Sequence, residues 1–130
     1  MQAVRYSRQR EAIKNYLLST TLHPTAEMVY NNIKEELPNI SLGTVYRNLN
    51  FLACHNEAIR LNCGDGYVHF DGCTYPHNHF FCRQCKSLSD IEMDSIQHID
   101  KIANAGFDGI IEGHNVIFYG ICHNCLKNSI

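Results

Sequence analysis

The sequence lacks any apolar run near the about 20 residues needed to cross a bilayer as a helix. Its opening, Met1 to Arg10, is polar and arginine-rich and has no apolar centre of the kind that a signal peptide needs. Internal repeats and low-complexity tracts are missing as well. We therefore expect a soluble, cytoplasmic protein with no membrane partner. Its 130 residues suffice for one ordinary domain or two small ones.

An excess of positive charge is also missing. The chain has 11 Lys and Arg against 13 Asp and Glu, a formal net charge of −2. This balance alone does not indicate nucleic-acid binding, so that function would have to follow from where particular residues lie. Cysteine is abundant, with 7 residues, beside 8 histidines. The odd number argues against a fully paired disulfide scaffold and favours metal or redox chemistry in a reducing cytosol.

The first half reads as three helices. Ser7 can cap a helix that runs to about Ser19, Thr25 a helix that Pro38 stops, and Ser41 a third. Apolar side chains of the third helix share one stripe, formed by Leu42, Val45, Leu49 and Leu52.

The pattern changes after the third helix. Ile59, Leu61 and Cys63 alternate with polar residues, the run 64–66 signals a turn, and 67–71 reads as a second strand. Three helices and a hairpin are typical of a winged helix-turn-helix, in which the third helix reads bases. We assign residues 1–70 to a winged-helix DNA-binding domain and 71–76 to a hinge.

The second half reads as an α/β domain over residues 77–130. We expect strands at 77–82, 88–92, 107–112 and 116–122, and a helix capped by Asp94 with Gln97 in capping-box position. The strand at 116–122 is apolar on both faces, and a unit of this size can hardly cover both. We therefore expect a homodimer interface to bury the apolar face of this strand that the unit itself leaves exposed. The fold class expected for the chain is therefore α+β, with an N-terminal winged helix and a C-terminal dimerisation domain.

Two Cys-x-x-Cys pairs have metal-ligand spacing. Paired thiolates of this spacing can share one ion, and two such pairs complete a tetrahedron. A redox dithiol would explain one pair but not both. We predict a structural Zn²⁺ site with no open coordination position, formed by Cys82, Cys85, Cys122 and Cys125.

A second candidate metal group contains histidines and carboxylates. His77 and His79 share one face of a predicted strand, with Cys82 on the other. Asp71, Asp90 and His23 could complete an open five-coordinate site for Fe²⁺, Mn²⁺ or Zn²⁺. By pattern alone, His77 and His79 could instead be surface residues, and the pattern favours a loop position for His23.

Taken together, these residues resemble the ferric uptake regulator family over nearly the whole chain. The resemblance rests on five motifs in order, at residues 5–10 (RYSRQR), 23–26 (HPTA), 41–49 (SLGTVYRNL), 77–85 (HNHFFCRQC) and 119–125 (YGICHNC). It implies a metal-dependent homodimeric transcriptional repressor that binds an inverted-repeat operator in double-stranded DNA. It further implies that the regulatory ion, Fe²⁺ or Mn²⁺, is bound by His23, Asp71, His77, His79 and Asp90.

Within that family, an aspartate at the position of Asp90 is similar to the peroxide-responsive branch, whereas the iron-responsive branch typically has glutamate. The resemblance then implies that peroxide oxidises His23 or His77 when Fe²⁺ is bound, and that the repressor leaves DNA. The chain begins about one helix later than many members, and Cys54, Cys63 and Cys73 are additional. We interpret these three as small buried or hinge residues rather than a thiol sensor.

The third helix is the expected DNA-reading element. With its apolar stripe inward, Thr44, Tyr46, Arg47 and Asn50 can face outward, and Arg47 can pair with guanine or hold a phosphate. Arg5, Arg8 and Arg10 are further candidates for phosphate contact.

Three alternatives remain open. The chain could be an iron- or zinc-responsive repressor of metal uptake. A non-haem metalloenzyme is a different class, but the sequence offers no obvious general base beside a substrate pocket, so we predict that the chain is not an enzyme. A zinc-ribbon interaction module would leave His23 and the 41–49 motif unexplained.

Overall fold

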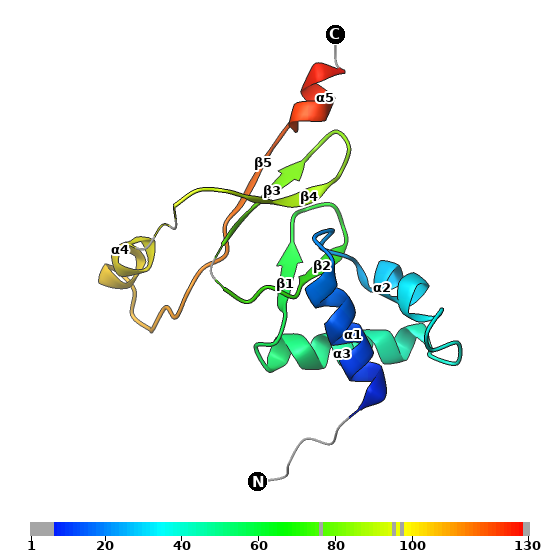
Figure 1. Cartoon of the computed structure of the whole chain (residues 1–130). Coiled ribbons are helices and arrows are strands. Elements are labelled where there is room, and N and C mark those ends of the chain that lie inside the picture. The colour runs from blue at the N-terminus through cyan, green and yellow to red at the C-terminus, as the bar shows by residue number, and fades with distance from the viewer. Residues whose placement is uncertain (1–6, 76, 95, 97, 129–130) are drawn as a thin grey trace. The chain divides into compact units, whose positions relative to one another are not determined.

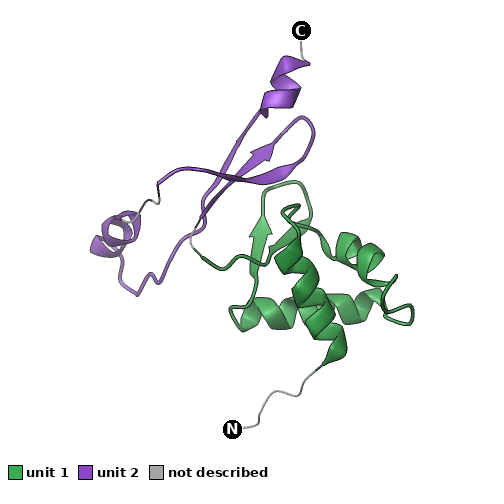
Figure 2. Cartoon of the chain, viewed as in Figure 1, with its two compact units in different colours: residues 1–75 green, residues 76–130 purple. Residues whose placement is uncertain are grey.

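The computed structural model describes residues 7–75, 77–94, 96 and 98–128. The chain divides into two compact units, residues 1–75 and 76–130 (Figure 2). The division falls inside the segment 71–76 that we expected as a hinge. Arg5 and Gln97, named above, lie outside the described residues.

Three helices form most of the first unit: α1 (Arg8–Ser19), α2 (Ala26–Ile33) and α3 (Leu42–Cys54) (Figure 1). Each begins after a hydroxyl side chain that accepts a hydrogen bond of 3.1–3.3 Å from the backbone N–H three residues on. These caps are Ser7, Thr25 and Ser41, as the sequence predicted. α2 ends earlier than expected, at Ile33 rather than before Pro38, in a turn where Leu37 N–H donates to the Ile33 carbonyl.

The helices enclose one apolar core. Of the expected inward side chains of α3, Val45, Leu49 and Leu52 are fully buried, whereas Leu42 at the start of the helix is half-buried. The three buried side chains pack with Ile13 and Leu17 of α1 and with apolar residues of α2. The opposite face of α3 is thereby turned to solvent.

A hairpin completes this unit. β1 (Ile59–Asn62) and β2 (Val68–Asp71) pair antiparallel, and the predicted turn contains Gly64 and Gly66, with φ of 85° and 86°. The loop before α2 adds to the open edge of β2, because Phe70 N–H donates to the Pro24 carbonyl over 2.9 Å. The result is a winged helix-turn-helix.

The described residues of the second unit form a small mixed sheet and two helices. Its elements are β3 (Asn78–Cys82), β4 (Leu88–Ile91), α4 (Ile99–Ala105), β5 (Ile117–Gly120) and α5 (His123–Lys127). The strand order is β4-β3-β5, with β3 and β4 antiparallel and β3 and β5 parallel. The connection between the parallel strands contains α4 (Figure 1). With the winged helix, this sheet confirms the α+β class.

Two sequence predictions for this unit are wrong. No strand forms at 107–112, because the Asn104 side-chain amide donates to the Ile111 carbonyl and accepts from the Ile111 N–H. A strand at 107–112 would need these backbone groups for hydrogen bonds to a neighbouring strand. The helix also does not begin at Asp94: α4 starts at Ile99, and its N-cap His98 makes no side-chain capping bond.

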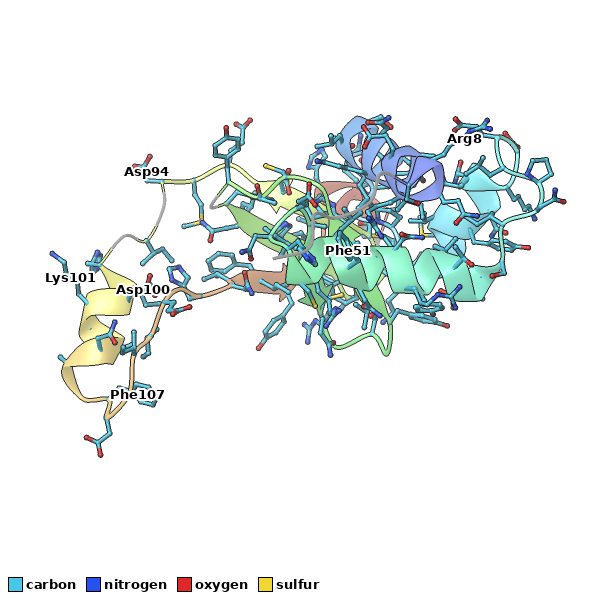
Figure 3. All side chains as sticks on the ribbon, turned by 90° about the horizontal axis from the view of Figure 1, so that it is seen from below. Arg8, Phe51, Asp94, Asp100, Lys101 and Phe107 are labelled. Carbon is cyan, nitrogen blue, oxygen red and sulfur yellow. The ribbon has the colours of Figure 1, made fainter. Side chains whose placement is uncertain are left out.

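Residues of the second unit leave much of its apolar surface exposed. α4 buries none of its side chains, and Phe107, in the turn that follows, is 55% exposed (Figure 3). Tyr119 on β5 is 71% exposed and Ile110 83%. These exposed apolar side chains are available for a protein–protein interface. Among the described residues, no helix is long and apolar enough to span a membrane.

Candidate metal centres

The parallel pairing of β3 and β5 brings the two Cys-x-x-Cys pairs together. Cys82 lies opposite Gly120 in the register, so both strands end at the same edge of the sheet and each continues into a cysteine pair. Arg83 N–H donates to the Gly120 carbonyl over 2.8 Å and fixes this register at its end. The ligands are therefore positioned by the sheet itself.

The geometry of the four cysteines fits zinc. Their sulfur atoms all lie within 4.8 Å of one another, and Cys85 Sγ is 3.8 Å from Cys122 Sγ. A tetrahedral ion with Zn–S bonds of about 2.3 Å places its sulfur ligands about 3.8 Å apart. Two backbone N–H groups, of Cys85 and Cys122, also donate to Cys82 Sγ at 3.4 Å. Such donors stabilise a thiolate ligand.

Electrostatics also favour a cation here. The N–H groups of Cys85 and Cys122 lower the pKa of Cys82 to about 6. The neighbouring Cys122 thiol raises the pKa of Cys125 to about 12. Thiols this close cannot all ionise unless a positive charge compensates them, and a dication supplies that charge.

The first unit provides one half of the second candidate metal group. His23 Nε2 is 3.1 Å from Asp71 Oδ2, and both side chains are buried. The other oxygen, Asp71 Oδ1, accepts from Cys73 N–H over 2.9 Å, which orients the carboxylate toward the imidazole. His23 has φ of 52°, a left-handed conformation that costs energy for a residue with a Cβ. Strain at a buried imidazole–carboxylate pair is typical of a functional position.

The second unit provides candidate ligands of its own. His79 on β3 lies directly opposite Asp90 on β4. Asp90 Oδ1 is 3.3 Å from His77 Nε2 and 3.5 Å from His79 Nε2, and the two imidazole centroids are 4.4 Å apart. Three ligand atoms therefore converge, and Asp90 is half-exposed. Imidazole and carboxylate ligands suit Fe²⁺, Mn²⁺ or Zn²⁺.

A third cluster was missed in the sequence. Cys63, Asp65 and His69, on the hairpin of the first unit, have ligand atoms within 4.8 Å of one another. The turn at 64–66 lies between Cys63 and the strand that contains His69, and Asp65 is within the turn. This close spacing of three possible ligands was the signal that the sequence offered. Of the additional cysteines, Cys63 is half-buried while Cys54 and Cys73 are exposed, so the buried role that we expected does not apply to Cys54.

The solvent-facing side of α3 carries the predicted DNA-reading residues. Tyr46, Arg47 and Asn50 are exposed and Thr44 is half-buried. Arg47 Nη2 donates to Thr44 Oγ1 over 2.8 Å, and the Tyr46 hydroxyl donates to Glu27 over 2.9 Å, which raises the pKa of Tyr46. These two hydrogen bonds, both between described residues, hold the Arg47 and Tyr46 side chains on the exposed face of α3.

The arginines near this face differ in their surroundings. Arg8 is exposed at the start of α1, whereas the Arg10 guanidinium lies 3.6 Å from the Phe51 ring centroid, and its Nε donates to Asn48 Oδ1 over 3.2 Å. Arg10 thus joins α1 to α3. Arg60, which we did not single out from sequence, donates to Asn50 from β1 and adds a cation beside α3.

A winged helix joined to a sheet with a four-cysteine cluster and a group of imidazole and carboxylate ligands defines a metal-binding transcriptional regulator. Comparison with known proteins narrows this class: the sequence profile of the ferric uptake regulator family matches residues 1–119. The chain belongs to the ferric uptake regulator family, whose members are dimeric DNA-binding regulators and not enzymes.

Individual relatives agree with this assignment. A peroxide-responsive repressor of Staphylococcus aureus (strain USA300) is 34% identical over 122 residues, which is 94% of this chain and 82% of the relative. The structure of a Campylobacter jejuni peroxide stress regulator is similar with a TM-score of 0.78 at 26% identity, covering 90% of this chain and 88% of that one. The Helicobacter pylori ferric uptake regulator shares the fold, with a TM-score of 0.78 at 22% identity, covering 95% and 83%.

Proposed function

We propose that this chain is a homodimeric, peroxide-sensing repressor. It binds an inverted-repeat operator when Fe²⁺ or Mn²⁺ occupies a regulatory site, and it releases DNA when peroxide oxidises the Fe²⁺ form. The observation that carries the proposal is Asp90 beside His77 and His79, in a chain similar to a peroxide-responsive repressor. As a DNA-binding repressor of transcription, the protein acts in the cytoplasm.

The regulatory ion acts as a clamp in this proposal. His23 and Asp71 offer two ligands on the first unit, and His77, His79 and Asp90 offer three on the second. Neither set alone completes the five-coordinate site that the family resemblance implies. One ion shared by both sets favours a single arrangement of the two units, and a homodimer so arranged can match two operator half-sites.

The peroxide step balances without a further reductant. Bound Fe²⁺ supplies the electron transfer to peroxide that Mn²⁺ and Zn²⁺ do not supply. Over the whole reaction the imidazole of His23 or His77 gains one oxygen atom and loses two electrons, and the other peroxide oxygen leaves as water. The modified ring no longer offers the same nitrogen ligand, so the clamp weakens and DNA is released.

DNA contact is assigned to the exposed face of α3 and to nearby arginines. Arg47 stands on this face with Thr44, Tyr46 and Asn50, and each can reach a base edge or a phosphate. Arg5, Arg8 and Arg10 are proposed phosphate contacts. The Zn²⁺ at Cys82, Cys85, Cys122 and Cys125 supports the dimerising unit and takes no part in sensing.

The test compares two metal forms of one protein. The zinc-loaded dimer is prepared anaerobically with Fe²⁺ or with Mn²⁺, treated with near-stoichiometric peroxide, and then treated with a thiol reductant. We expect the Fe²⁺ form alone to lose DNA affinity and to retain one oxygen on a peptide containing His23 or His77. Reductant reverses disulfides and sulfenic acids, so retained oxygen separates this route from oxidation of Cys54, Cys63 or Cys73.

Two variants sharpen the test. Asp90→Glu keeps a carboxylate and should keep metal-dependent DNA binding while its Fe²⁺ form resists peroxide. His23→Ala should lose metal-stimulated DNA binding while zinc content and dimerisation stay unchanged. Equal resistance of the Fe²⁺ and Mn²⁺ wild-type forms to peroxide would instead favour an iron- or zinc-responsive repressor.

A further inference from the structure

We propose that the hairpin of the first unit contains an additional metal site, formed by Cys63, Asp65 and His69, that takes a thiophilic divalent cation such as Zn²⁺. The site is separate from the four-cysteine cluster and from the ligands of the regulatory ion. It goes beyond the proposed function, which neither requires nor assigns it.

The three side chains are an adequate ligand set. Their ligand atoms lie within 4.8 Å of one another, and His69 Nε2 is 2.8 Å from Asp65 Oδ2. A thiolate, an imidazole and a carboxylate are all common zinc ligands, and three protein ligands leave a fourth tetrahedral position for water. The site would therefore be open, unlike the four-cysteine cluster.

The turn orients the carboxylate before any ion is present. Gly64 and Gly66 both have positive φ, which lets the chain turn back sharply on each side of Asp65. Asp65 Oδ1 accepts from Tyr67 N–H over 3.0 Å, so its other oxygen is the one that faces His69. A preorganised ligand loses less entropy when it binds.

The imidazole is held with the correct nitrogen toward the cluster. His69 Nδ1 is 2.9 Å from the backbone carbonyl of His23, which can only accept, so Nδ1 carries the hydrogen. Nε2, which donates to Asp65 Oδ2 over 2.8 Å without metal, is then the nitrogen that would lose its proton and bind the ion. A backbone carbonyl that fixes the ring of a metal-binding histidine in this way recurs in metal sites.

Burial separates this cluster from an ordinary surface turn. The side chains of Asp65 and His69 are each 10% exposed, and Cys63 is half-buried. An ion pair that merely closes the hairpin needs only the carboxylate and the imidazole. The Cys63 thiol also hydrogen-bonds to the Asp65 side chain, so the third group that a thiophilic cation requires already faces the carboxylate.

Occupancy would stiffen the wing and the loop before α2 together. His69 contacts the His23 carbonyl through its ring, and its strand neighbour Phe70 donates to the Pro24 carbonyl. A cation bound to His69 therefore restrains the backbone of residues 23 and 24. We expect the hairpin amides to gain protection from hydrogen exchange when the site fills.

Co²⁺ is the probe for the experiment, because thiolate-bound Co²⁺ gives a charge-transfer absorption that nitrogen and oxygen ligands alone do not. The full-length zinc-loaded dimer carries His77→Ala and His79→Ala to remove the histidines of the second-unit cluster, and is titrated with Co²⁺ without oxygen. We expect this absorption to saturate at about one equivalent per chain, with zinc content unchanged.

Three further variants in that background decide the ligands. Cys63→Ser should abolish the thiolate absorption, while the matched control Cys73→Ser keeps it. Asp65→Asn preserves the turn, since its amide oxygen can still accept from Tyr67, and should weaken Co²⁺ affinity at least about tenfold as a ligand loss. No thiolate absorption in the starting protein, or absorption that Cys63→Ser leaves undiminished, would overturn the proposal.

Discussion

Gly72 approaches the end of α1 more closely than any residue with a Cβ could. A Cβ built at Gly72 would lie 2.8 Å from both the carbonyl carbon and the carbonyl oxygen of Leu17. Ordinary van der Waals contacts begin at 3.4 Å, so one of the two backbones must move by roughly 0.6 Å. Leu17 cannot yield easily, because its side chain is 2% exposed within the core of the first unit.

The substitution Gly72→Ala should therefore destabilise the first unit. Overpacking of this kind costs about 1–3 kcal/mol, while the smaller conformational freedom of alanine in the unfolded chain returns about 0.4–1 kcal/mol. The net expected loss is about 1–2 kcal/mol in the free energy of unfolding. Because Asp71 precedes Gly72, the same shift should also weaken binding of the regulatory ion.

Urea unfolding followed by far-ultraviolet circular dichroism is the assay, because most described helical residues lie in α1, α2 and α3. Gly43→Ala is the matched control. Its Cβ would meet Arg47 Nη1 at 3.6 Å, an ordinary contact, and alanine inside a helix is favoured over glycine by up to about 1 kcal/mol. The two variants should thus shift stability in opposite directions. A Gly72→Ala protein as stable as the wild type would refute the close approach.

Three other perturbations test the remaining structure. Cys122→Ser should remove the zinc and unfold the second unit, measured by zinc content and by loss of the dimer in sedimentation; a zinc-free dimer that stays folded would contradict the zinc assignment. Arg47→Ala should weaken operator binding by about 1–3 kcal/mol in a salt-controlled titration, with specificity relaxed at one base pair if Arg47 reads a base. Glu57→Gln removes the partner of Lys14, 2.7 Å away. Lys14 lowers the pKa of Glu57, so this loss of stability should appear at neutral pH and disappear as the pH falls through that pKa.

The sequence predicted the elements whose signals are local. Ser7, Thr25 and Ser41 cap helices because each side-chain oxygen reaches a backbone N–H only three residues on. The repeated Cys-x-x-Cys spacing of Cys82, Cys85, Cys122 and Cys125 likewise predicted one cluster, since a redox dithiol would explain only one of the two pairs.

Features set by individual side-chain contacts or turn conformations could not be predicted. The region 107–112 has strand-like composition, but the amide of Asn104 takes the backbone groups of Ile111. The positive φ of His23 lies in the loop that pairs with β2, and α2 ends early in the turn where Leu37 N–H donates to the Ile33 carbonyl. The Cys63–Asp65–His69 cluster depends on the turn conformation at Gly64 and Gly66, which brings together residues that a periodic strand pattern would separate.

The parallel register of β3 and β5 also determines the order in which the second unit can assemble. β3 and β4 form a local hairpin, whereas β5 must close a long connection before it gains any pairing, and such distant contacts form late in folding. An ion that bound first to Cys82 and Cys85 would have only half of its ligands until Cys122 and Cys125 reached it. Metal supply during synthesis, rather than the final stability of the zinc site, would then limit the yield of native protein.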